Sequence, residues 1–188
     1  MMWAHEALDK FKRLGLSEVL DIGSGEGEHA DSMRDAGMDV VTVSLCPPAN
    51  LVCDYMELDL DPVDGIWASH VLEHILNVDD FLQKCFHDLK PGGYLAVTVP
   101  PAKYELVGGH VSLWTEGLLL YRLILAGFDC SKAMVGVYGY NISVIVRKQE
   151  SILPPLAMDC GDIERLKHFF PCAMTEGMDG RLGNINWN

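Results

Sequence analysis

Three histidines and a glutamate are the side chains of this sequence best suited to proton transfer. His70, Glu73 and His74 follow one another in the segment HVLEH, so they lie on adjacent turns if this segment is helical. His110 comes later, at the end of a loop predicted at residues 100–110. Because histidine titrates near neutral pH, we interpret His70, His74 and His110 as candidate general bases.

The same residues offer a second chemistry, the binding of a divalent metal ion, if His110 folds back over the other two. Imidazole and carboxylate ligands together suit zinc better than magnesium. HVLEH also has the form of a zinc-protease motif, but that motif requires a long helix and here a strand directly precedes it. A base or a substrate contact is the favoured interpretation, a structural role is the main alternative, and we assign no metal ligand.

A second group of residues, the segment VLDIGSGEG at 19–27, is suited to holding a ligand. Its three glycines remove side-chain bulk and permit positive φ, so a ligand can contact the backbone. Their spacing is G-x-G-x-G and not the G-x-G-x-x-G of dinucleotide sites. Three carboxylates flank the loop and would repel a diphosphate, so they favour a ligand with a cationic part. These carboxylates are Asp21, Glu26 and Glu28.

The elements predicted around these residues alternate between strand and helix. Strands are predicted at 17–22, 39–45, 51–54, 64–69, 94–99, 133–138 and 142–147, and helices at 3–14, 28–36, 77–89 and 116–127. The apolar runs within the strands indicate a mostly parallel sheet that is covered on both faces. The last two strands are separated by only three residues, which favours a hairpin in which one strand runs antiparallel.

The composition of the chain changes after Gln149, where prolines, glycines and asparagines become frequent and one further helix is predicted at 163–170. We therefore expect one domain at residues 1–148 and a C-terminal tail at 149–188 that serves as a cap or arm or is partly disordered. Phe169, Phe170 and Trp187 of this tail are candidates to close a pocket or to make a homodimer contact.

The overall charge and the cysteines limit the partners and the compartment. A formal net charge of −13 argues against nucleic acid or an anionic membrane as the main partner. The six cysteines are widely and irregularly spaced without a CxxC pair, which indicates thiols in a reducing compartment. The first fourteen residues are amphipathic and charged, unlike a signal peptide, and no apolar run is long enough to span a membrane. We predict a cytoplasmic protein.

Five segments, in the right order, resemble the class I S-adenosylmethionine-dependent methyltransferases, in the broad group of small-molecule enzymes. They are VLDIGSGEG at 19–27, CDY at 53–55, DGIWASHVLEHI at 64–75, LKPGGYLAVTVP at 89–100 and HVSLWTEGLLLYRLILAGF at 110–128. The resemblance implies an α/β fold with a Rossmann-like doubly wound, mostly parallel seven-stranded sheet and an antiparallel C-terminal hairpin strand. It also implies S-adenosylmethionine as cofactor and methyl transfer to oxygen or nitrogen of a small-molecule acceptor. The sulfonium and ammonium groups of this cofactor suit the acidic loop.

The resemblance assigns a role to each residue of the glycine loop. Asp21 would act near the methionine ammonium through the loop. Gly23, Ser24, Gly25 and Gly27 would line the methionine and ribose parts of the cofactor.

The resemblance also implies contacts to the rest of the cofactor. Asp54 would accept a hydrogen bond from the adenine amino group with Tyr55 beside the ring, or else Asp54 caps a turn and Tyr55 belongs to the core. Ser69 and His70 would lie under the sulfonium. The family usually ends its second strand with an acid that binds both ribose hydroxyls, but Ser44 stands here. Loss of that charge-assisted pair weakens binding by roughly 1–3 kcal/mol.

Ser44 therefore motivates an alternative function, a non-catalytic methyltransferase-like binding module with a weakened cofactor site. A third alternative, a nucleotide-sugar or nicotinamide enzyme, is disfavoured because the third glycine of the dinucleotide motif is absent. Tyr104 and Trp114 flank the loop where acceptors enter in this family. Each either stacks on the acceptor or packs within a lid.

Overall fold

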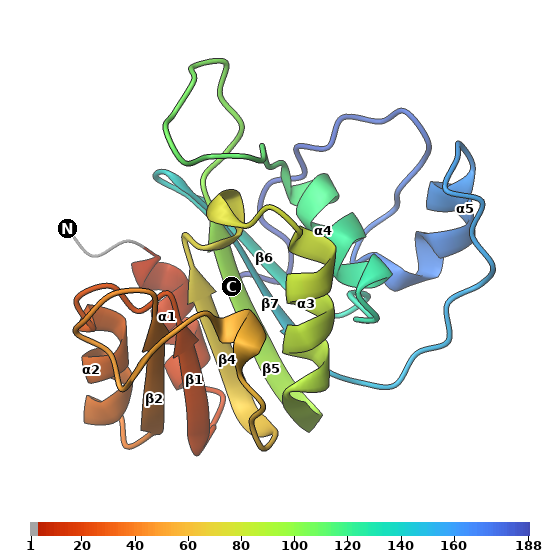
Figure 1. The fold of residues 1–188 in the computed structure, drawn as a ribbon. Helices are drawn as coiled ribbons and strands as arrows, with labels where there is room; N and C mark the ends of the chain where they lie inside the picture. Colours follow the sequence, from red (N-terminus) through yellow and green to blue (C-terminus); the bar gives the residue numbers. More distant parts are fainter. Residues whose placement is uncertain (1–3) are drawn as a thin grey trace.

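Seven strands form one sheet in the computed structural model, which describes residues 4–188. Their order is β3-β2-β1-β4-β5-β7-β6 (Figure 1). β7 runs antiparallel to both of its neighbours, and the pairs among β1 to β5 are parallel, so the predicted α/β fold class is confirmed. The strands are β1 (Glu18–Ile22), β2 (Asp39–Ser44), β3 (Leu51–Val52), β4 (Val63–Ser69), β5 (Leu89–Val99), β6 (Met134–Tyr138) and β7 (Asn141–Arg147).

Helices cover both faces of this sheet, with α1 and α2 on one face and α3 and α4 on the other (Figure 1). The α-helices are α1 (His5–Lys12), α2 (Glu28–Asp35), α3 (Val78–His87), α4 (Glu116–Leu125) and α5 (Asp162–Leu166). Three short 3₁₀ helices are Tyr55–Glu57, Leu72–His74 and Lys167–Phe169. The first helix begins two residues later than predicted, and residue 3 lies outside the described residues. Within residues 4–188, no helix combines the length and the apolar character needed to cross a membrane.

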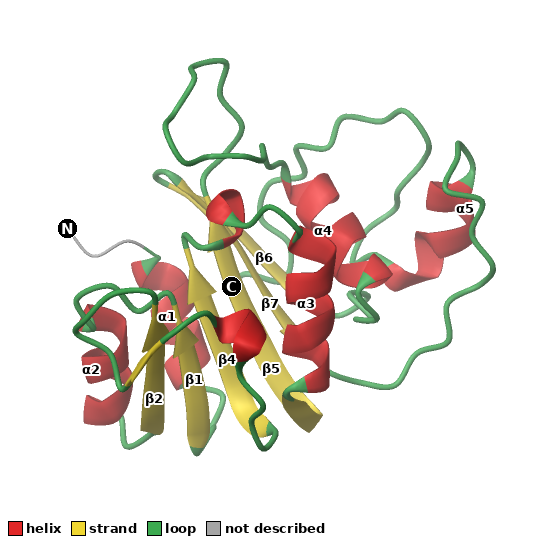
Figure 2. Ribbon diagram, viewed as in Figure 1, coloured by secondary structure: helices red, strands yellow, loops and turns green. Residues whose placement is uncertain are grey.

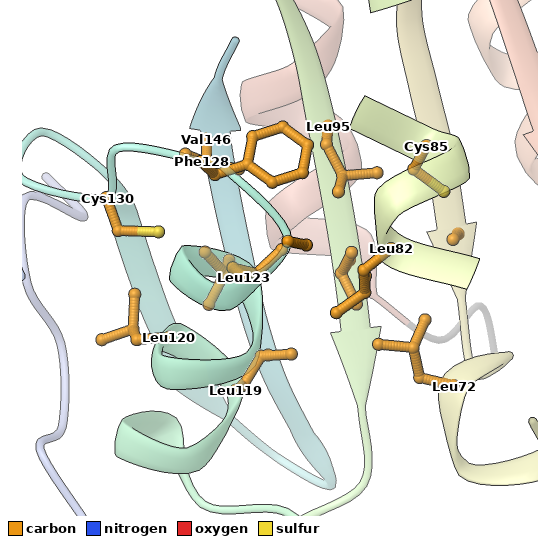
Figure 3. Close-up of a cluster of buried hydrophobic side chains, with 14 of the residues drawn as sticks. Leu72, Leu82, Cys85, Leu95, Leu119, Leu120, Leu123, Phe128, Cys130 and Val146 are labelled. Atoms are coloured by element: carbon orange, nitrogen blue, oxygen red, sulfur yellow. The ribbon is translucent and has the colours of Figure 1, made fainter. Parts of the chain in front are cut away.

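Alternation along the strands explains why both faces are covered. In β4, Ile66 and Ala68 belong to the apolar cluster beneath α3 and α4, whereas Trp67 belongs to the cluster beneath α1 and α2. The larger cluster includes Leu82 and Leu123, from the two helices that pack on that face (Figure 3). A strand with apolar side chains on both faces must be covered twice, so the strand pattern dictates the layered architecture.

The structure corrects the predicted boundary between α3 and β5. We predicted a helix to residue 89 and a strand from residue 94, but α3 ends at His87 and β5 begins at Leu89. Leu89 pairs with Val63, and the register then shifts before Tyr94 pairs with Gly65. This irregularity lets the Pro-Gly-Gly segment remain within the strand, since a bulge tolerates proline.

The tail at 149–188 packs against the N-terminal helix and the outer strand of the sheet. Trp187 is 8% exposed, stacks on Tyr138 with ring centroids 5.9 Å apart, and donates a hydrogen bond from Nε1 to Glu6 Oε2. Phe170 is also buried, within the larger apolar cluster. Intramolecular contacts therefore bury both rings, and the role of the tail in closing a pocket or in a homodimer contact stays a prediction.

Candidate functional site

A cavity of about 550 Å³ opens at the carboxyl ends of β1 and β2 and reaches the segment after β4. The strand order reverses between β1 and β4, and ligands bind at such a switch point in doubly wound sheets. Six of the predicted site residues line this cavity: Gly23, Ser44, Asp54, Tyr55, His70 and His74. Four loop residues and Ser69 do not line it, and His110 lines a second cavity instead. The four loop residues are Asp21, Ser24, Gly25 and Gly27.

Gly23 is the position where the loop after β1 meets the segment after β4. Its φ is +72°, and a Cβ added there would lie 2.5 Å from Val71 Cγ2. Its amide donates a hydrogen bond to the Val43 carbonyl oxygen over 2.8 Å. Only glycine fits this close approach, which brings the two loops together as neighbouring walls of the cavity.

Several buried polar atoms near this cavity have no hydrogen-bond partner among residues 4–188. They are Asp21 Oδ2, Ser24 Oγ, Ser69 Oγ and Glu73 Oε2, together with Trp114 Nε1 elsewhere. Buried polar groups in folded proteins are nearly always hydrogen-bonded, because an unpaired one costs about 1–3 kcal/mol. The first four belong to β1, the loop after β1, the end of β4 and the segment that follows β4. Their position indicates groups that a ligand would satisfy.

Asp21 is the buried carboxylate of this set, with 1% of its surface exposed. Burial raises the pKa of Asp21 to about 7, although the nearby Arg34 guanidinium opposes the shift. A cation next to this carboxylate would stabilise its charged form and lower the pKa again. The environment of Asp21 therefore favours a ligand with a positive group, as the acidic loop predicts.

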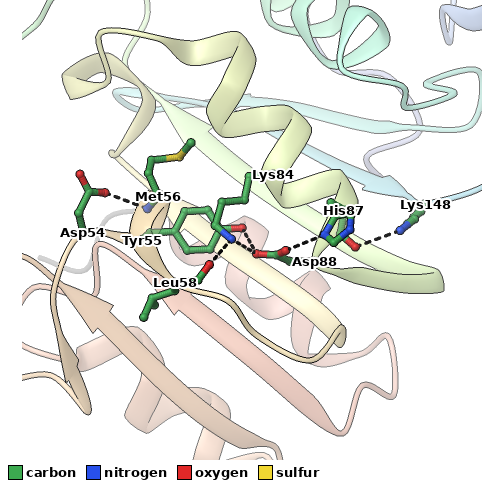
Figure 4. A network of polar contacts seen from close by, with 8 residues as sticks. All are labelled: Asp54, Tyr55, Met56, Leu58, Lys84, His87, Asp88 and Lys148. Carbon is green, nitrogen blue, oxygen red and sulfur yellow. Dashed lines mark hydrogen bonds and ion pairs between the residues drawn. The ribbon is translucent and has the colours of Figure 1, made fainter.

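Asp54 and Tyr55 begin the short helix that forms one wall of the cavity. Asp54 Oδ1 accepts a hydrogen bond from the Met56 amide over 2.9 Å, so this carboxylate caps a turn and also lines the cavity. The Tyr55 hydroxyl donates to Asp88 Oδ2 over 2.8 Å, and Lys84 Nζ lies 4.8 Å from the Tyr55 ring centroid (Figure 4). Tyr55 is 4% exposed and belongs to the core, as the alternative interpretation had it.

His70 is held by partners on both ring nitrogens. Nδ1 lies 3.0 Å from Glu73 Oε1, and Nε2 lies 3.0 Å from Asn141 Oδ1. Asn141 Nδ2 donates to the Tyr138 carbonyl oxygen, an arrangement that turns Oδ1 towards His70 and places a proton on Nε2. Burial alone would lower the pKa of His70, but the hydrogen bonds to Glu73 and Asn141 outweigh it and the pKa is raised.

The backbone of His70 is itself unusual, with φ at +56°. Non-glycine residues rarely adopt this conformation, and where they do it is often at functional sites. With both nitrogens occupied, His70 lacks the free lone pair that a general base needs. The structure therefore favours a positioning role for His70, between the segment after β4 and the β6–β7 hairpin.

His74 has the geometry that His70 lacks. Its Nδ1 lies 3.0 Å from the Gly109 carbonyl oxygen, which can only accept a hydrogen bond, so Nδ1 carries the proton. In the neutral ring Nε2 then keeps its lone pair. The ring is exposed, lines the cavity and meets the edge of His110 with centroids 5.1 Å apart. Of the three predicted bases, His74 is the one best prepared to accept a proton.

Glu73, His74 and His110 also form a group that fits a divalent metal ion. One ligand atom from each lies within 4.8 Å of the others, and Glu73 Oε2 is buried without a partner among the described residues. Two imidazoles and one carboxylate suit zinc. His70 does not belong to this group, because Glu73 and Asn141 hold it.

The two aromatic candidates for acceptor stacking differ in exposure. Trp114 is 1% exposed within the larger apolar cluster, so its predicted alternative, packing within the protein, is the one observed. Tyr104 is fully exposed and lines the second cavity. Sequence reasoning missed Val71, which contacts the glycine loop, and Asn141, which lies 71 residues from its partner His70. No local sequence pattern connects such distant residues.

A comparison with protein families agrees with the fold. Residues 3–133, which are more than half of the chain, match the family model described as "Methyltransferase domain". The chain therefore belongs to the methyltransferase domain family, the class I S-adenosylmethionine-dependent methyltransferases. This confirms the family expected from the five sequence segments.

Individual curated relatives match this chain over only part of their length. The chain is 30% identical to the mitochondrial ubiquinone biosynthesis O-methyltransferase of Rattus norvegicus, over 48% of this chain and 32% of that protein. It thus spans about a third of the length of the curated relatives that it matches.

Solved structures share the fold. A Burkholderia thailandensis 1,6-didemethyltoxoflavin-N1-methyltransferase with bound 1,6-didemethyltoxoflavin and S-adenosylhomocysteine superposes with a TM-score of 0.66, at 21% identity over 79% of this chain and 81% of that one. An Archaeoglobus fulgidus SAM-dependent methyltransferase gives a TM-score of 0.60, at 18% identity over 77% of this chain and 94% of that one. At these identities the likeness shows the fold alone.

Proposed function

We propose that this chain transfers the methyl group of S-adenosylmethionine to oxygen or nitrogen of a small-molecule acceptor. The observation that carries the proposal is a set of buried polar atoms without partners among the described residues, on residues that directly adjoin in sequence the lining of one cavity at the switch point of the sheet. Asp21, Ser24 and Ser69 contribute three of them. The relatives support the same reaction class, since their printed names include an O-methyltransferase and an N1-methyltransferase.

In the proposed complex, the first cavity holds the cofactor between the loop after β1 and the segment after β4. We assign the lining residues Ser44 and Asp54 to the nucleoside. Asp21 and Ser24 adjoin lining residues in sequence, and we assign them to the cationic methionine part. The protein then has to align the acceptor with the methyl group and exclude water, because the sulfonium is already electrophilic. These residues contribute binding and orientation.

Methyl transfer breaks the sulfur–methyl bond and forms a bond between the acceptor atom and the methyl carbon. The electron pair of the broken bond stays on sulfur and leaves S-adenosylhomocysteine. A hydroxyl acceptor must also lose its proton, and we assign that proton to Nε2 of His74. Gly109 supports this role, because its carbonyl oxygen accepts a hydrogen bond from Nδ1 and so leaves Nε2 free.

The group Glu73, His74 and His110 provides a second candidate for acceptor activation, a bound divalent ion. The observation in its favour is the partnerless Glu73 Oε2 beside two imidazoles. When bound, such an ion would stabilise an acceptor oxyanion as a Lewis acid. A thermal-shift titration separates the candidates. If zinc raises the Tm of the wild type but not that of His110→Gln, these residues hold the ion, and an unchanged Tm leaves His74 as the base.

Calorimetric titration with S-adenosylmethionine and S-adenosylhomocysteine tests the cofactor. We expect saturable binding of both, and a loss of about 10-fold or more in Asp21→Ala. Asp35→Ala is the matched control, because Asp35 is exposed at the end of α2 opposite to the loop. If neither nucleoside gives heat at high protein concentration, the proposed function is wrong.

Transfer itself separates an enzyme from a binding module. We expect release of S-adenosylhomocysteine with a suitable phenol or heteroaromatic acceptor, and binding without any release would favour the non-catalytic alternative. With an acceptor that the wild type methylates, His74→Gln should lower kcat by about 10²-fold or more while cofactor affinity stays unchanged. His70→Gln should mainly lower stability, since the buried Glu73 and Asn141 would lose a partner.

We also propose that the protein works in a reducing compartment such as the cytoplasm. All six cysteines are free thiols in the structure, and burial raises the pKa of Cys85 to about 12, which makes this thiol inert. An acidic chain with a net charge of −13 is also a poor partner for nucleic acid.

A further inference from the structure

A second cavity of about 290 Å³ lies beside the first, between the loop at residues 100–113 and the tip of the β6–β7 hairpin. This loop rises above the carboxyl end of β5 (Figure 2). Two side-chain pairs connect the cavities: His74 meets His110 with centroids 5.1 Å apart, and His70 stacks on Tyr140 with centroids 6.5 Å apart. In each pair the first ring lines the first cavity and the second ring lines the second.

The second cavity is largely apolar and has an exposed apolar rim. Leu106 and Tyr104 are almost fully exposed, and Leu113 is 58% exposed. All three line the cavity. Large apolar side chains that gather in solvent around one opening often mark a binding site. Here they favour a ligand with an apolar body.

Among the described residues 4–188, Lys103 is the only lysine or arginine that lines either cavity. Its Nζ lies 4.1 Å from the ring centroid of Tyr140, a cation–π contact that positions the ammonium. Among residues 4–188 no carboxylate lies within salt-bridge distance of this ammonium. An ammonium has three N–H donors, and the face of a ring engages only one side of it. The other donors face solvent or a ligand.

We propose that the second cavity is the acceptor subsite, and that the acceptor is an apolar molecule with one anionic group bound by Lys103. This inference rests on the proposed function, because it places the acceptor beside the cofactor cavity. Glu105 lines the same cavity, so a single negative charge fits better than a highly charged group. With its anion at Lys103, the acceptor extends past Tyr140 towards His74, where its nucleophilic atom meets the base.

A matched pair of fluorescent probes tests this subsite. 1-Anilinonaphthalene-8-sulfonate and N-phenyl-1-naphthylamine share an apolar body, and only the first carries an anion. Both are titrated into protein saturated with S-adenosylhomocysteine, so that the first cavity is filled. We expect the sulfonate to bind at least about 10-fold more tightly than the neutral probe.

Two lysine variants identify the residue that binds the sulfonate group of the probe. Lys103→Met should weaken the sulfonate by about 10-fold and leave the neutral probe unchanged, whereas Lys132→Met, an exposed lysine outside both cavities, should change neither. Equal binding of both probes, an unchanged sulfonate affinity in Lys103→Met, or displacement of the sulfonate by S-adenosylhomocysteine would each overturn the proposal.

The failure of this inference differs from the failure of the proposed function. If S-adenosylhomocysteine binds but Lys103→Met leaves the sulfonate affinity unchanged, the proposed methyltransferase function stands and the proposed acceptor class is wrong. If S-adenosylhomocysteine does not bind, both the proposed function and the acceptor assignment are wrong.

Discussion

Two groups of buried polar side chains differ in how completely their hydrogen-bonding atoms have partners. In the network of Tyr55, Lys84 and Asp88, the carboxylate accepts hydrogen bonds from both the hydroxyl and the ammonium (Figure 4). Around the first cavity, by contrast, Asp21 and Ser69 each keep an atom without a partner among the described residues. The first group stabilises the framework, whereas the unpaired atoms of the second cost stability, which agrees with the ligand-binding role proposed for them.

The largest expected effect comes from breaking the satisfied network. Asp88→Ala would leave the Tyr55 hydroxyl and the Lys84 ammonium without their buried partner, and we expect a loss of about 3 kcal/mol in the free energy of unfolding. Urea denaturation measures this loss. The exposed Asp35 is the matched control, and Asp35→Ala should change stability by less than about 0.5 kcal/mol. Equal effects of the two variants would contradict the comparison.

The second effect depends on pH and concerns Asp21. Its folded pKa of about 7 is raised above the usual 3.8, so its contribution to stability is full below pH 3.8 and is lost as the pH rises through 7. Between pH 5 and pH 8 this loss amounts to roughly 3 kcal/mol. Asp21→Asn cannot ionise and should lose less stability over that range. Urea midpoints at the two pH values provide the measurement, and parallel pH profiles of wild type and variant would refute the assignment.

The third effect is a gain in affinity. Ser44 lines the first cavity at the end of β2, where the family usually places an acid. Ser44→Asp should restore a charge-assisted pair with the ribose hydroxyls and tighten S-adenosylhomocysteine binding by about 10-fold in calorimetry. The control Ser32→Asp lies on α2 beside Lys12 and should leave the affinity unchanged. Weaker binding in Ser44→Asp would mean that another group already holds the ribose.

The smallest expected effect concerns stability and compares two buried serine hydroxyls, one with hydrogen-bond partners and one without. Ser143 Oγ has two partners, Thr98 Oγ1 at 2.7 Å and the Tyr138 hydroxyl at 2.9 Å, whereas Ser69 Oγ has none among the described residues. Ser143→Ala should lower the free energy of unfolding by about 1–2 kcal/mol. Ser69→Ala should leave it unchanged or raise it slightly, while it weakens cofactor binding. A clear loss of stability in Ser69→Ala would show that its hydroxyl supports the framework.

Much of the fold follows from local sequence. The apolar runs before Gly23 and across residues 94–99 predict buried strands, because each is too short for a helix and carries apolar side chains on both faces. The boundary at Leu89 was predicted wrongly, because pairing with Val63 holds a Pro-Gly-Gly segment in the strand. Pairing between strands is a tertiary effect that the local pattern does not contain.

The site was predicted less completely. The glycine loop and the segment HVLEH predict which residue types lie at the cavity. They do not predict which of these residues takes which role. His70 differs from His74 because Asn141 and Glu73 occupy its nitrogens, and Asn141 reaches it only through the fold. The proposed acceptor subsite rests on Lys103 and Tyr140, which come from separate loops.

The contact between β6 and the last residues of the chain has a consequence for self-association. Val135 and Ile185 exchange two backbone hydrogen bonds, and the Val137 amide donates to Asn184, so the outermost strand has its amide groups engaged. Gly136 makes room for the Trp187 ring, which a Cβ there would meet at 2.1 Å. Exposed strand margins recruit strands from other molecules. Shortening this chain by its final residues would uncover such a margin and promote aggregation while leaving the cofactor cavity intact.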